Sequence, residues 1–399
     1  MARALLLDAA RTPFGRYRGG LSGIRVDDLA ALPLTELVRR HGSGGSGRLD
    51  PASIDDVLYG NTNGAGEENR NVARMATLLA GLPPTVPGST VNRLCASGGE
   101  SIVQATRAIR AGDGELFVAG GVEGMSRAPF VVPRPERALP DRLETVSTAL
   151  GWRLVNPKMP GGWTVPLGRA AEQVAVELGI GRGEMDAHAL RSHRRAAAAW
   201  DAGVHDGFAF PVTAPDGSVV RRDESVRTET SEEKLGRLGP AFSADGPVTA
   251  GNSSPLNDGA LATLVGTEEQ AARLGVEPLG EVLGSATAAT EPDRFALAPV
   301  PAVHRLLERL GATAEDVDLW EINEAFSAMV LSVLHQLPDV DRERVNVHGG
   351  AIAYGHPLGA SMPRVVVDLC RHLGHRGGGL GIAAACVGAG QGMAVAVRA

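Results

Sequence analysis

Short apolar segments alternate with amphipathic stretches along most of the chain. The apolar segments are rich in valine, alanine and leucine and predict strands at 4–7, 57–59, 90–94, 116–119, 319–322, 351–353 and 380–386. Amphipathic stretches between them predict helices, among them 28–40, 101–110, 170–178, 185–200 and 302–310. Because strands that alternate with helices form parallel sheets covered by helices on both faces, this pattern predicts an α/β fold.

The order of these elements repeats within the chain. Residues 55–61 read DDVLYGN and residues 316–326 read DVDLWEINEAF, each an acidic start, a strand and an asparagine. Later, STVNRLCASGGES and ELFVAGGVEGMS in the first half correspond to RVNVHGGAIAYGHPLGAS and GLGIAAACVGAGQGMA in the second half. A strand, a glycine-rich turn, a helix and a second strand therefore recur in one order, which predicts a duplicated α/β unit.

The middle of the chain has a different composition. Residues 126–251 carry three prolines close together, a Pro-Gly-Gly run and a charge-dense stretch at 221–237, which is typical of a large insertion. We therefore predict an N-terminal domain of residues 1–125 plus 252–275, an inserted loop domain of residues 126–251, and a C-terminal domain of residues 276–399. The uncharged segment 377–397 is interrupted by glycines and predicts two buried strands joined by a turn, not a membrane span.

Charge and cysteine content narrow the classes of function. The chain has 39 basic and 46 acidic residues, a net charge of −7, and no basic block, so we expect no nucleic-acid partner. Three cysteines are an odd number that predicts no disulfide framework and favours a reducing, cytoplasmic location. The apolar run at 4–7 is too short for a signal peptide, and we expect no membrane partner.

Cys95 is the first candidate for chemistry. It lies where a predicted strand ends and a helix begins, so unpaired amides and the helix dipole favour a thiolate there. A lowered pKa matters because a free thiol is only slightly ionised at neutral pH. The alternative is a small buried cysteine without a chemical role.

Three further residues occupy comparable places in the predicted sheets. His356 lies in a glycine- and proline-bounded turn, Cys386 follows a buried strand, and Asn323 ends another strand. Each has a purely structural alternative, and Cys370, in a helical pattern, is expected to lie in the core. Because sites in such sheets gather at the carboxyl ends of strands, we expect Cys95, Asn323, His356 and Cys386 to converge.

The motifs resemble those of the thiolase family, which comprises acetyl-CoA acetyltransferases and 3-ketoacyl-CoA thiolases. The resemblance covers essentially the whole chain and rests on RTPFG (11–15), VNRLCASG (91–98), GGVEGMSRAP (120–129), VTAGNSSPLNDGA (248–260), NEAF (323–326), GGAIAYGHPLGAS (349–361) and CVGAGQG (386–392). It implies duplicated α/β/α layers with an inserted loop domain that binds CoA. It also implies reversible thiolytic cleavage of 3-ketoacyl-CoA by a ping-pong acyl-cysteine mechanism.

The resemblance also implies a role for each catalytic candidate. Cys95 would be acylated, His356 would activate it, and Cys386 would exchange the second proton as acid and base. A thiol titrates close enough to neutrality to serve both directions. One oxyanion would lie near His356 and a water held by Asn323, and the other on the backbone amides of Cys95 and Gly388.

CoA contacts follow from the same resemblance. Ser254 would contact the pantetheine arm, Phe242 and Phe326 would wall it, and Arg227 would lie near the nucleotide end. For Arg227 the alternative is a solvated face in a run of mixed charge. The resemblance implies no metal and no tightly bound cofactor beyond CoA and acyl-CoA as substrates, and it implies a homodimer or homotetramer.

Several positions depart from the usual family pattern. Leu167 lies between Pro166 and Gly168 where many acetoacetyl-specific members have a His-Met pair, while Met362 and Ala389 replace glycines. We expect Met362 to place a flexible side chain near the His356 loop, and together these departures leave the acyl-chain specificity open to a larger or unusual 3-ketoacyl group. The stretch GWRLVNPKMP (151–160) is more similar to β-ketoadipyl-CoA thiolases than to short-chain ones. A decarboxylating ketosynthase and a non-catalytic acyl-CoA-binding relative remain as alternatives.

Overall fold

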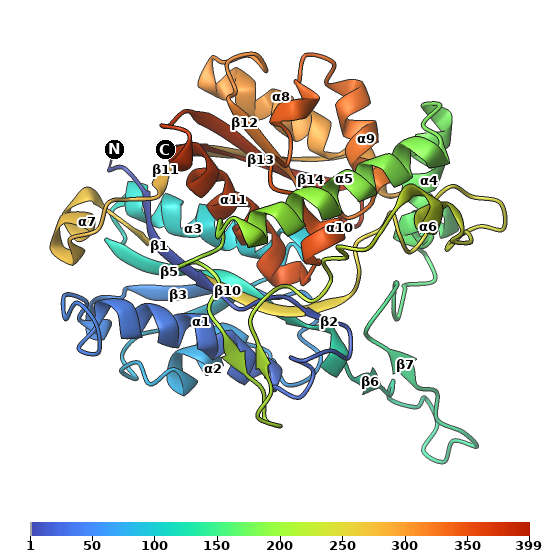
Figure 1. Ribbon diagram of the computed structural model, residues 1–399. Helices are drawn as coiled ribbons and strands as arrows, with labels where there is room; N and C mark the ends of the chain where they lie inside the picture. The colour runs from blue at the N-terminus through green and yellow to red at the C-terminus, as the bar shows by residue number, and fades with distance from the viewer. Residues whose placement is uncertain (1) are drawn as a thin grey trace.

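A mixed β-sheet runs through the molecule and is built from two similar halves. The computed structural model describes residues 2–399 (Figure 1). In the first half the strand order is β4 (Gly88–Val91), β3 (Asp56–Gly60), β5 (Leu116–Gly124), β10 (Asn257–Gly266) and β1 (Leu5–Arg11). The second half continues with β11 (Gly280–Ala289), β14 (Gln391–Arg398), β13 (Leu380–Val387) and β12 (Leu319–Ile322). The short strand β2 (Gly15–Arg16) pairs with β10.

The two halves have the same internal order and the same strand directions. In each half a parallel pair, β3–β5 or β12–β13, is followed by two antiparallel partners, β10 and β1 or β14 and β11. The parallel neighbour β4 of β3 has its counterpart in the parallel bridge between Trp320 and Val345. This correspondence confirms the duplicated α/β unit that the sequence predicts.

Two features of the predicted sheet are wrong. The sheet is mixed and not parallel, because β1, β10, β11 and β14 all run antiparallel to their neighbours. The segment 351–353 is not a strand but most of the short helix α10 (Ala351–Tyr354), because Gly349, with a φ of 88°, turns the chain just before it. The hairpin of β13 and β14 confirms that residues 377–397 form two buried strands.

Helices form a layer on each outer face of the sheet and a third layer between its halves. Figure 1 shows α1 (Val26–His41) and α2 (Val72–Leu79) below the first half, and α8 (Pro299–Leu310) and α9 (Ser327–Gln336) above the second. Between the halves lie α3 (Ser97–Ala111) and α11 (Leu358–His375). Most side chains of α11 are buried, as expected for a helix with sheet on both sides.

The segment between β5 and β10 lies beside this layered body. It contains β6 (Phe130–Val131), β7 (Val146–Ser147), α4 (Leu167–Glu177), α5 (Arg182–Asp201), β8 (Val212–Thr213), β9 (Val219–Val220) and α6 (Glu232–Gly236). Figure 1 shows β6 and β7 on an arm that extends away from the body, while α5 crosses over α10. The helix α7 (Glu268–Leu274) follows β10. Within residues 2–399, no helix combines the length and the apolar character that a membrane span requires.

Candidate active site

Cys95 lies in a tight turn that leads directly into α3. The turn is the short 3-10 helix η2 (Leu94–Ala96), and Leu94 has a φ of 46°, in the left-handed region that disfavours side chains with a Cβ. The hydroxyl of Ser97 holds the turn, because it donates to the Leu94 carbonyl (2.6 Å) and accepts from the Arg93 amide (2.9 Å). A strained residue held in this way fixes the orientation of the neighbouring cysteine.

Burial determines the ionisation of Cys95. It raises the pKa of the thiol to about 11, although the backbone amides of Gly388 and of Cys95 itself hydrogen-bond to the sulfur and lower it. The expectation that the helix start lowers this pKa below the ordinary value is therefore wrong. The resting group is a thiol, and a base has to remove its proton before the sulfur can act as a nucleophile.

Cys386 lies next to Cys95 at the end of β13. It is buried, and burial followed by the charge of the neighbouring Cys95 raises the pKa of its thiol well above the ordinary range. The turn after β13 brings the Gly388 amide to the Cys95 sulfur. A Cβ on Gly388 would lie 3.0 Å from Cδ1 of Leu94, so the turn after β13 lies close to the cysteine turn.

His356 lies in the turn between α10 and α11. Its Nδ1 is 2.6 Å from the Ser361 hydroxyl, and that hydroxyl donates its own hydrogen to the Pro357 carbonyl (2.8 Å). The Ser361 oxygen therefore accepts from Nδ1–H, which leaves Nε2 as the unprotonated nitrogen. Burial, with the charge of Arg364, lowers the pKa of His356 to about 4, so the ring is neutral at pH 7.

Nε2 of His356 is available as a base. It is buried, and no described residue hydrogen-bonds to it. The backbone amide of His356 donates to Oδ1 of Asn257 (2.9 Å), which fixes the turn. An unpaired, unprotonated nitrogen can accept a proton from a group that comes within hydrogen-bond reach.

The glycines after Cys95 bring the cysteine turn close to the histidine turn. A Cβ on Gly98 would overlap the carbonyl oxygen of Gly359, in the first turn of α11 just after His356, and would approach Cγ of Pro363 to 2.6 Å. The turn η2 also packs against both α11 and β13. The structure thus gathers the segments that carry Cys95, His356 and Cys386, and the histidine follows a short helix and not the strand expected from the sequence.

Asn323 directly follows β12, as the sequence predicts. Its backbone amide donates to the Ala384 carbonyl (2.8 Å) of the neighbouring strand β13. Both polar atoms of its side chain are buried and have no hydrogen-bond partner in residues 2–399. Because a buried amide is costly unless it is paired, its partner is expected to be a water or a bound molecule.

Comparisons with known proteins place the whole chain in one family. The model of the N-terminal thiolase domain matches residues 4–269, and the model of the C-terminal thiolase domain matches residues 276–399. The chain belongs to the thiolase family. It is an acyltransferase of the class that catalyses thiolytic cleavage of 3-ketoacyl-CoA, which agrees with the sequence prediction and not with the ketosynthase or non-catalytic alternatives.

Individual relatives are similar over nearly their full length. The chain is 48% identical over 402 residues to a β-ketoadipyl-CoA thiolase of Escherichia coli, covering 99% of both chains. It is 47% identical, again over 99% of both, to the 3-oxoadipyl-CoA/3-oxo-5,6-dehydrosuberyl-CoA thiolase of Escherichia coli strain K12. The structure of human mitochondrial 3-ketoacyl-CoA thiolase in complex with CoA matches with a TM-score of 0.91 and 33% identity, over 100% of this chain and 98% of that one.

Glu123 is a buried residue of this thiolase that the motifs alone do not single out as functional. Its carboxylate accepts the backbone amides of Thr62, Asn63 and Gly359, each at 3.0 Å. Burial raises its pKa to about 7. The carboxylate joins the turn after β3 to the first turn of α11, just after His356. The only signal in the sequence is an acidic residue within an otherwise apolar strand.

The predicted CoA contacts are only partly brought together in the thiolase structure. Ser254 donates its amide to Ala325 (2.9 Å), and the adjacent Phe326 packs edge-to-face against Phe242 with ring centroids 5.9 Å apart. Leu167 lies at the proposed reaction centre, where its Cδ1 would be 3.9 Å from a Cβ on Gly388. Arg227 is exposed on a separate segment, where its backbone amide donates to His193 (3.2 Å).

Met362 directly follows Ser361, whose hydroxyl contacts the His356 ring. Its side chain is fully buried in the apolar cluster between α3 and α11. A Cβ on Gly99 would overlap its Cγ, so Met362 is directed at α3 and fills space beside that glycine. The side chain packs into the helix interface, and its effect on acyl-chain specificity stays a prediction.

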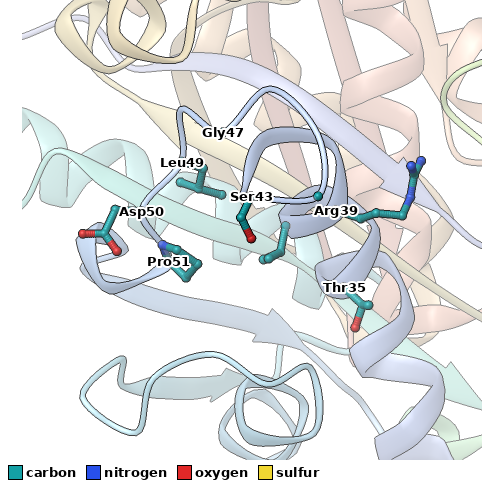
Figure 2. A pocket seen from close by; sticks show the side chains of 9 residues that line it. Thr35, Arg39, Ser43, Gly47, Leu49, Asp50 and Pro51 are labelled. Atoms are coloured by element: carbon teal, nitrogen blue, oxygen red, sulfur yellow. The ribbon is translucent and has the colours of Figure 1, made fainter.

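A hollow elsewhere on the thiolase surface contains none of the predicted residues. It has a volume of about 530 Å³ and lies between the end of α1 and the glycine-rich loop that follows it (Figure 2). Thr35, Arg39 and Ser43 line it together with the backbone around Gly47. The hollow is open and belongs to a surface loop, so the candidate chemistry remains with Cys95, His356 and Cys386.

Proposed function

We propose that this thiolase cleaves 3-ketoacyl-CoA substrates whose acyl chain ends in a carboxylate, through an acyl intermediate on Cys95. Two of the most similar relatives are named for 3-oxoadipyl substrates, which carry such a carboxylate. The observation that carries the proposed mechanism is the packing of η2, which contains Cys95, against β13, which contains the second thiol, Cys386.

In the proposed first half-reaction, the Cys95 proton moves to Nε2 of His356. The thiolate attacks the 3-keto carbon, and the bond between C2 and C3 breaks with its electron pair remaining on C2. The Cys386 thiol protonates this carbon, which releases acetyl-CoA and leaves an acyl group on Cys95. Two thiols with raised pKa values suit these steps, because each holds its proton until a partner removes or needs it.

In the second half-reaction, the thiol of CoA attacks the acyl-Cys95 carbonyl and acyl-CoA leaves. The proton of the CoA thiol passes to the Cys386 thiolate, while the Cys95 sulfur recovers the proton held on His356. Two oxygens become negatively charged in these steps. We propose that the amides of Cys95 and Gly388 stabilise the oxygen of the group bound to Cys95. We propose that His356, with a water held by Asn323, stabilises the oxygen of the acetyl-CoA enolate. Loss of one such donor typically costs about 10²- to 10³-fold in rate.

We further propose that CoA lies across the side of the molecule formed by the inserted segment. Ser254, Phe242 and Phe326 would contact the pantetheine arm, Leu167 would line the acyl end, and Arg227 would meet the nucleotide. The edge-to-face pair of Phe242 and Phe326 offers a half-buried apolar wall for a flexible arm. In this proposal residues 126–251 act as a CoA-binding insertion within the N-terminal domain.

The intermediate can be tested by intact-mass analysis after incubation with an acyl-CoA. We expect an acyl adduct on the wild type and on Cys386→Ala, and none on Cys95→Ala. The Cys386→Ala variant should no longer exchange the α-protons of acetyl-CoA with solvent. An adduct that persists in Cys95→Ala, or wild-type exchange in Cys386→Ala, would contradict the assigned roles.

The substrate class can be tested by a panel of 3-ketoacyl-CoAs. We expect kcat/KM to be higher for 3-oxoadipyl-CoA than for 3-oxohexanoyl-CoA, which has a methyl group in place of the carboxylate, and higher than for acetoacetyl-CoA. Equal or lower values for 3-oxoadipyl-CoA would contradict the proposed preference. We also propose a cytoplasmic homodimer or homotetramer, and light scattering on the purified protein would distinguish these from a monomer.

A further inference from the structure

The segment after β7 passes the proposed reaction centre and returns to the turn that precedes Cys95. Its Trp152 ring would lie 3.5 Å from a Cβ on Gly388, and its Nε1 donates to the Val165 carbonyl (3.2 Å). The ring therefore covers the glycine whose amide contacts the Cys95 sulfur. A substrate acyl group on Cys95 would extend beside this ring.

Arg153, the next residue, is anchored on the same side of the site. Its Nη2 donates to the carbonyl oxygen (2.9 Å) and the side-chain oxygen (3.2 Å) of Asn63, and Nη1 donates to the Thr148 carbonyl (3.2 Å). Thr62, the neighbour of Asn63, donates its hydroxyl to the Leu94 carbonyl (3.0 Å). The guanidinium is thus linked through one short turn to the residue before Cys95.

The charge of Arg153 has no counterpart in residues 2–399. All three of its acceptors are neutral, and no carboxylate of that range lies within ion-pair distance of its guanidinium. Glu123 shares a partner with Arg153, because its carboxylate accepts the Asn63 amide. Burial nevertheless raises the pKa of Glu123 to about 7, whereas a paired guanidinium would lower it. Nε–H and the second hydrogen of Nη1 remain free to donate.

Other cations near the site are already used or exposed. Arg93, two residues before Cys95, pairs with Glu100 (2.9 Å) and also donates to Gln391. Lys158, on the same segment as Arg153, is exposed to solvent. A half-buried guanidinium with neutral partners is therefore peculiar to Arg153 in this part of the site.

We propose that Arg153 binds the terminal carboxylate of the acyl chain and so determines the preference for dicarboxylic substrates. This inference rests on the proposed function, which supplies the acyl-Cys95 intermediate and the carboxylate. A planar guanidinium with free donors suits a carboxylate, and the two neutral anchors hold it in place before the substrate binds. The acyl group formed from a six-carbon dicarboxylic substrate has only two methylene groups between its thioester and its carboxylate.

The test compares two substrates of equal length, 3-oxoadipyl-CoA and 3-oxohexanoyl-CoA, in wild type, Arg153→Gln, Arg153→Lys and Lys158→Gln. We expect Arg153→Gln to lower kcat/KM for 3-oxoadipyl-CoA by about 10- to 100-fold, as for loss of a charge-assisted pair. The value for 3-oxohexanoyl-CoA should change by less than about threefold. Arg153→Lys should retain part of the discrimination, and Lys158→Gln, which removes a charge from the same segment, should retain all of it.

The outcomes separate this inference from the proposed function. If the wild type itself does not prefer the dicarboxylic substrate, the proposed substrate class is wrong. If the wild type prefers it, and Arg153→Gln lowers kcat/KM equally for both substrates or for neither, the inference is overturned. Arg153 would then have a structural or CoA-binding role. If Arg153→Gln does not fold, Arg153→Lys provides the test. A carboxylate site predicts that kcat/KM falls more for 3-oxoadipyl-CoA than for 3-oxohexanoyl-CoA, whereas an anchor for Asn63 predicts no such difference. Acylation of the wild type and Arg153→Lys by succinyl-CoA and butyryl-CoA, followed by mass, gives the same comparison without turnover.

Discussion

The Ser361 hydroxyl accepts a hydrogen bond from Nδ1 of His356, at 2.6 Å, and donates one to the Pro357 carbonyl. Both residues are buried, and they lie on either side of the first turn of α11. Because the hydroxyl hydrogen is donated to the Pro357 carbonyl, the serine oxygen can only accept from the histidine ring. The histidine is therefore the tautomer with its proton on Nδ1. The nitrogen left unprotonated is the one without a protein partner, and it is the nitrogen to which we assign the Cys95 proton.

Replacing Ser361 by alanine should therefore slow catalysis more than it weakens substrate binding. We expect kcat to fall about fivefold, since one neutral hydrogen bond worth ~1 kcal/mol is lost, with little change in KM. Ser361→Thr retains the hydroxyl and should recover most of the rate. Steady-state kinetics with thermal unfolding in parallel checks this, and an equal loss in both variants would indicate a packing effect instead.

The ionisation state of Cys95 predicts how its reactivity depends on pH. Burial raises the pKa of its thiol to about 11, while that of His356 is lowered to about 4, so neither group changes charge between pH 6 and 9. The thiolate fraction then grows with each pH unit, and alkylation of Cys95 by iodoacetamide should accelerate about tenfold per unit across this range. Mass analysis of peptides would measure alkylation of Cys95 separately from that of Cys370 and Cys386. A plateau below pH 8 would mean that the free enzyme already holds a thiolate paired with an imidazolium.

A third prediction concerns Glu123, whose carboxylate joins the turns around the site. One carboxylate oxygen accepts the amides of Thr62 and Gly359, and the other accepts Asn63 and the side chain of Asn61. In Glu123→Gln, either orientation of the new amide places an NH2 group against two N–H donors. We expect the free energy of unfolding to fall by about 1–3 kcal/mol, the cost of leaving buried donors unpaired. Urea unfolding measures this, and an unchanged midpoint would contradict the network.

The sequence predicts the positions of the candidate residues relative to strands and helices better than it predicts the directions of the strands. Cys95, Asn323 and Cys386 lie where the pattern of strands and glycines predicts, because each motif is local and the duplication repeats it. Strand direction is not local. The antiparallel placement of β1 and β11 depends on pairing with strands far away in the chain, which hydrophobic periodicity does not report.

Electrostatic properties of the site were the least predictable from sequence. A cysteine at a helix start is expected to have a lowered pKa, but at Cys95 desolvation outweighs the amide hydrogen bonds. Burial depends on the packing of η2 against α11 and β13, which come from the opposite end of the chain. For the same reason the partners of Arg153 could not be identified from the motif that contains it.

The contact between α3 and α11 gives a further prediction, which concerns Gly99 and Met362. A Cβ at position 99 would overlap Cγ of Met362, so Gly99→Ala should destabilise the protein by about 1–3 kcal/mol through overpacking. Met362→Ala alone should cost about 2–5 kcal/mol because it leaves a cavity in a fully buried cluster. In the double variant each change compensates for part of the other, so the two costs should not add.

Gly98→Ala is the matched control. Its Cβ would meet the Gly359 carbonyl and the Pro363 ring, and shortening the Met362 side chain removes neither of these contacts. Met362→Ala should therefore rescue Gly99→Ala but not Gly98→Ala, as measured by thermal unfolding of all five variants. Additive costs in both cycles would mean that α3 and α11 do not approach as closely as described. Since Cys95 lies two residues before α3 and His356 two residues before α11, this coupling also reports on the helix contact between the segments that carry the proposed nucleophile and the proposed base.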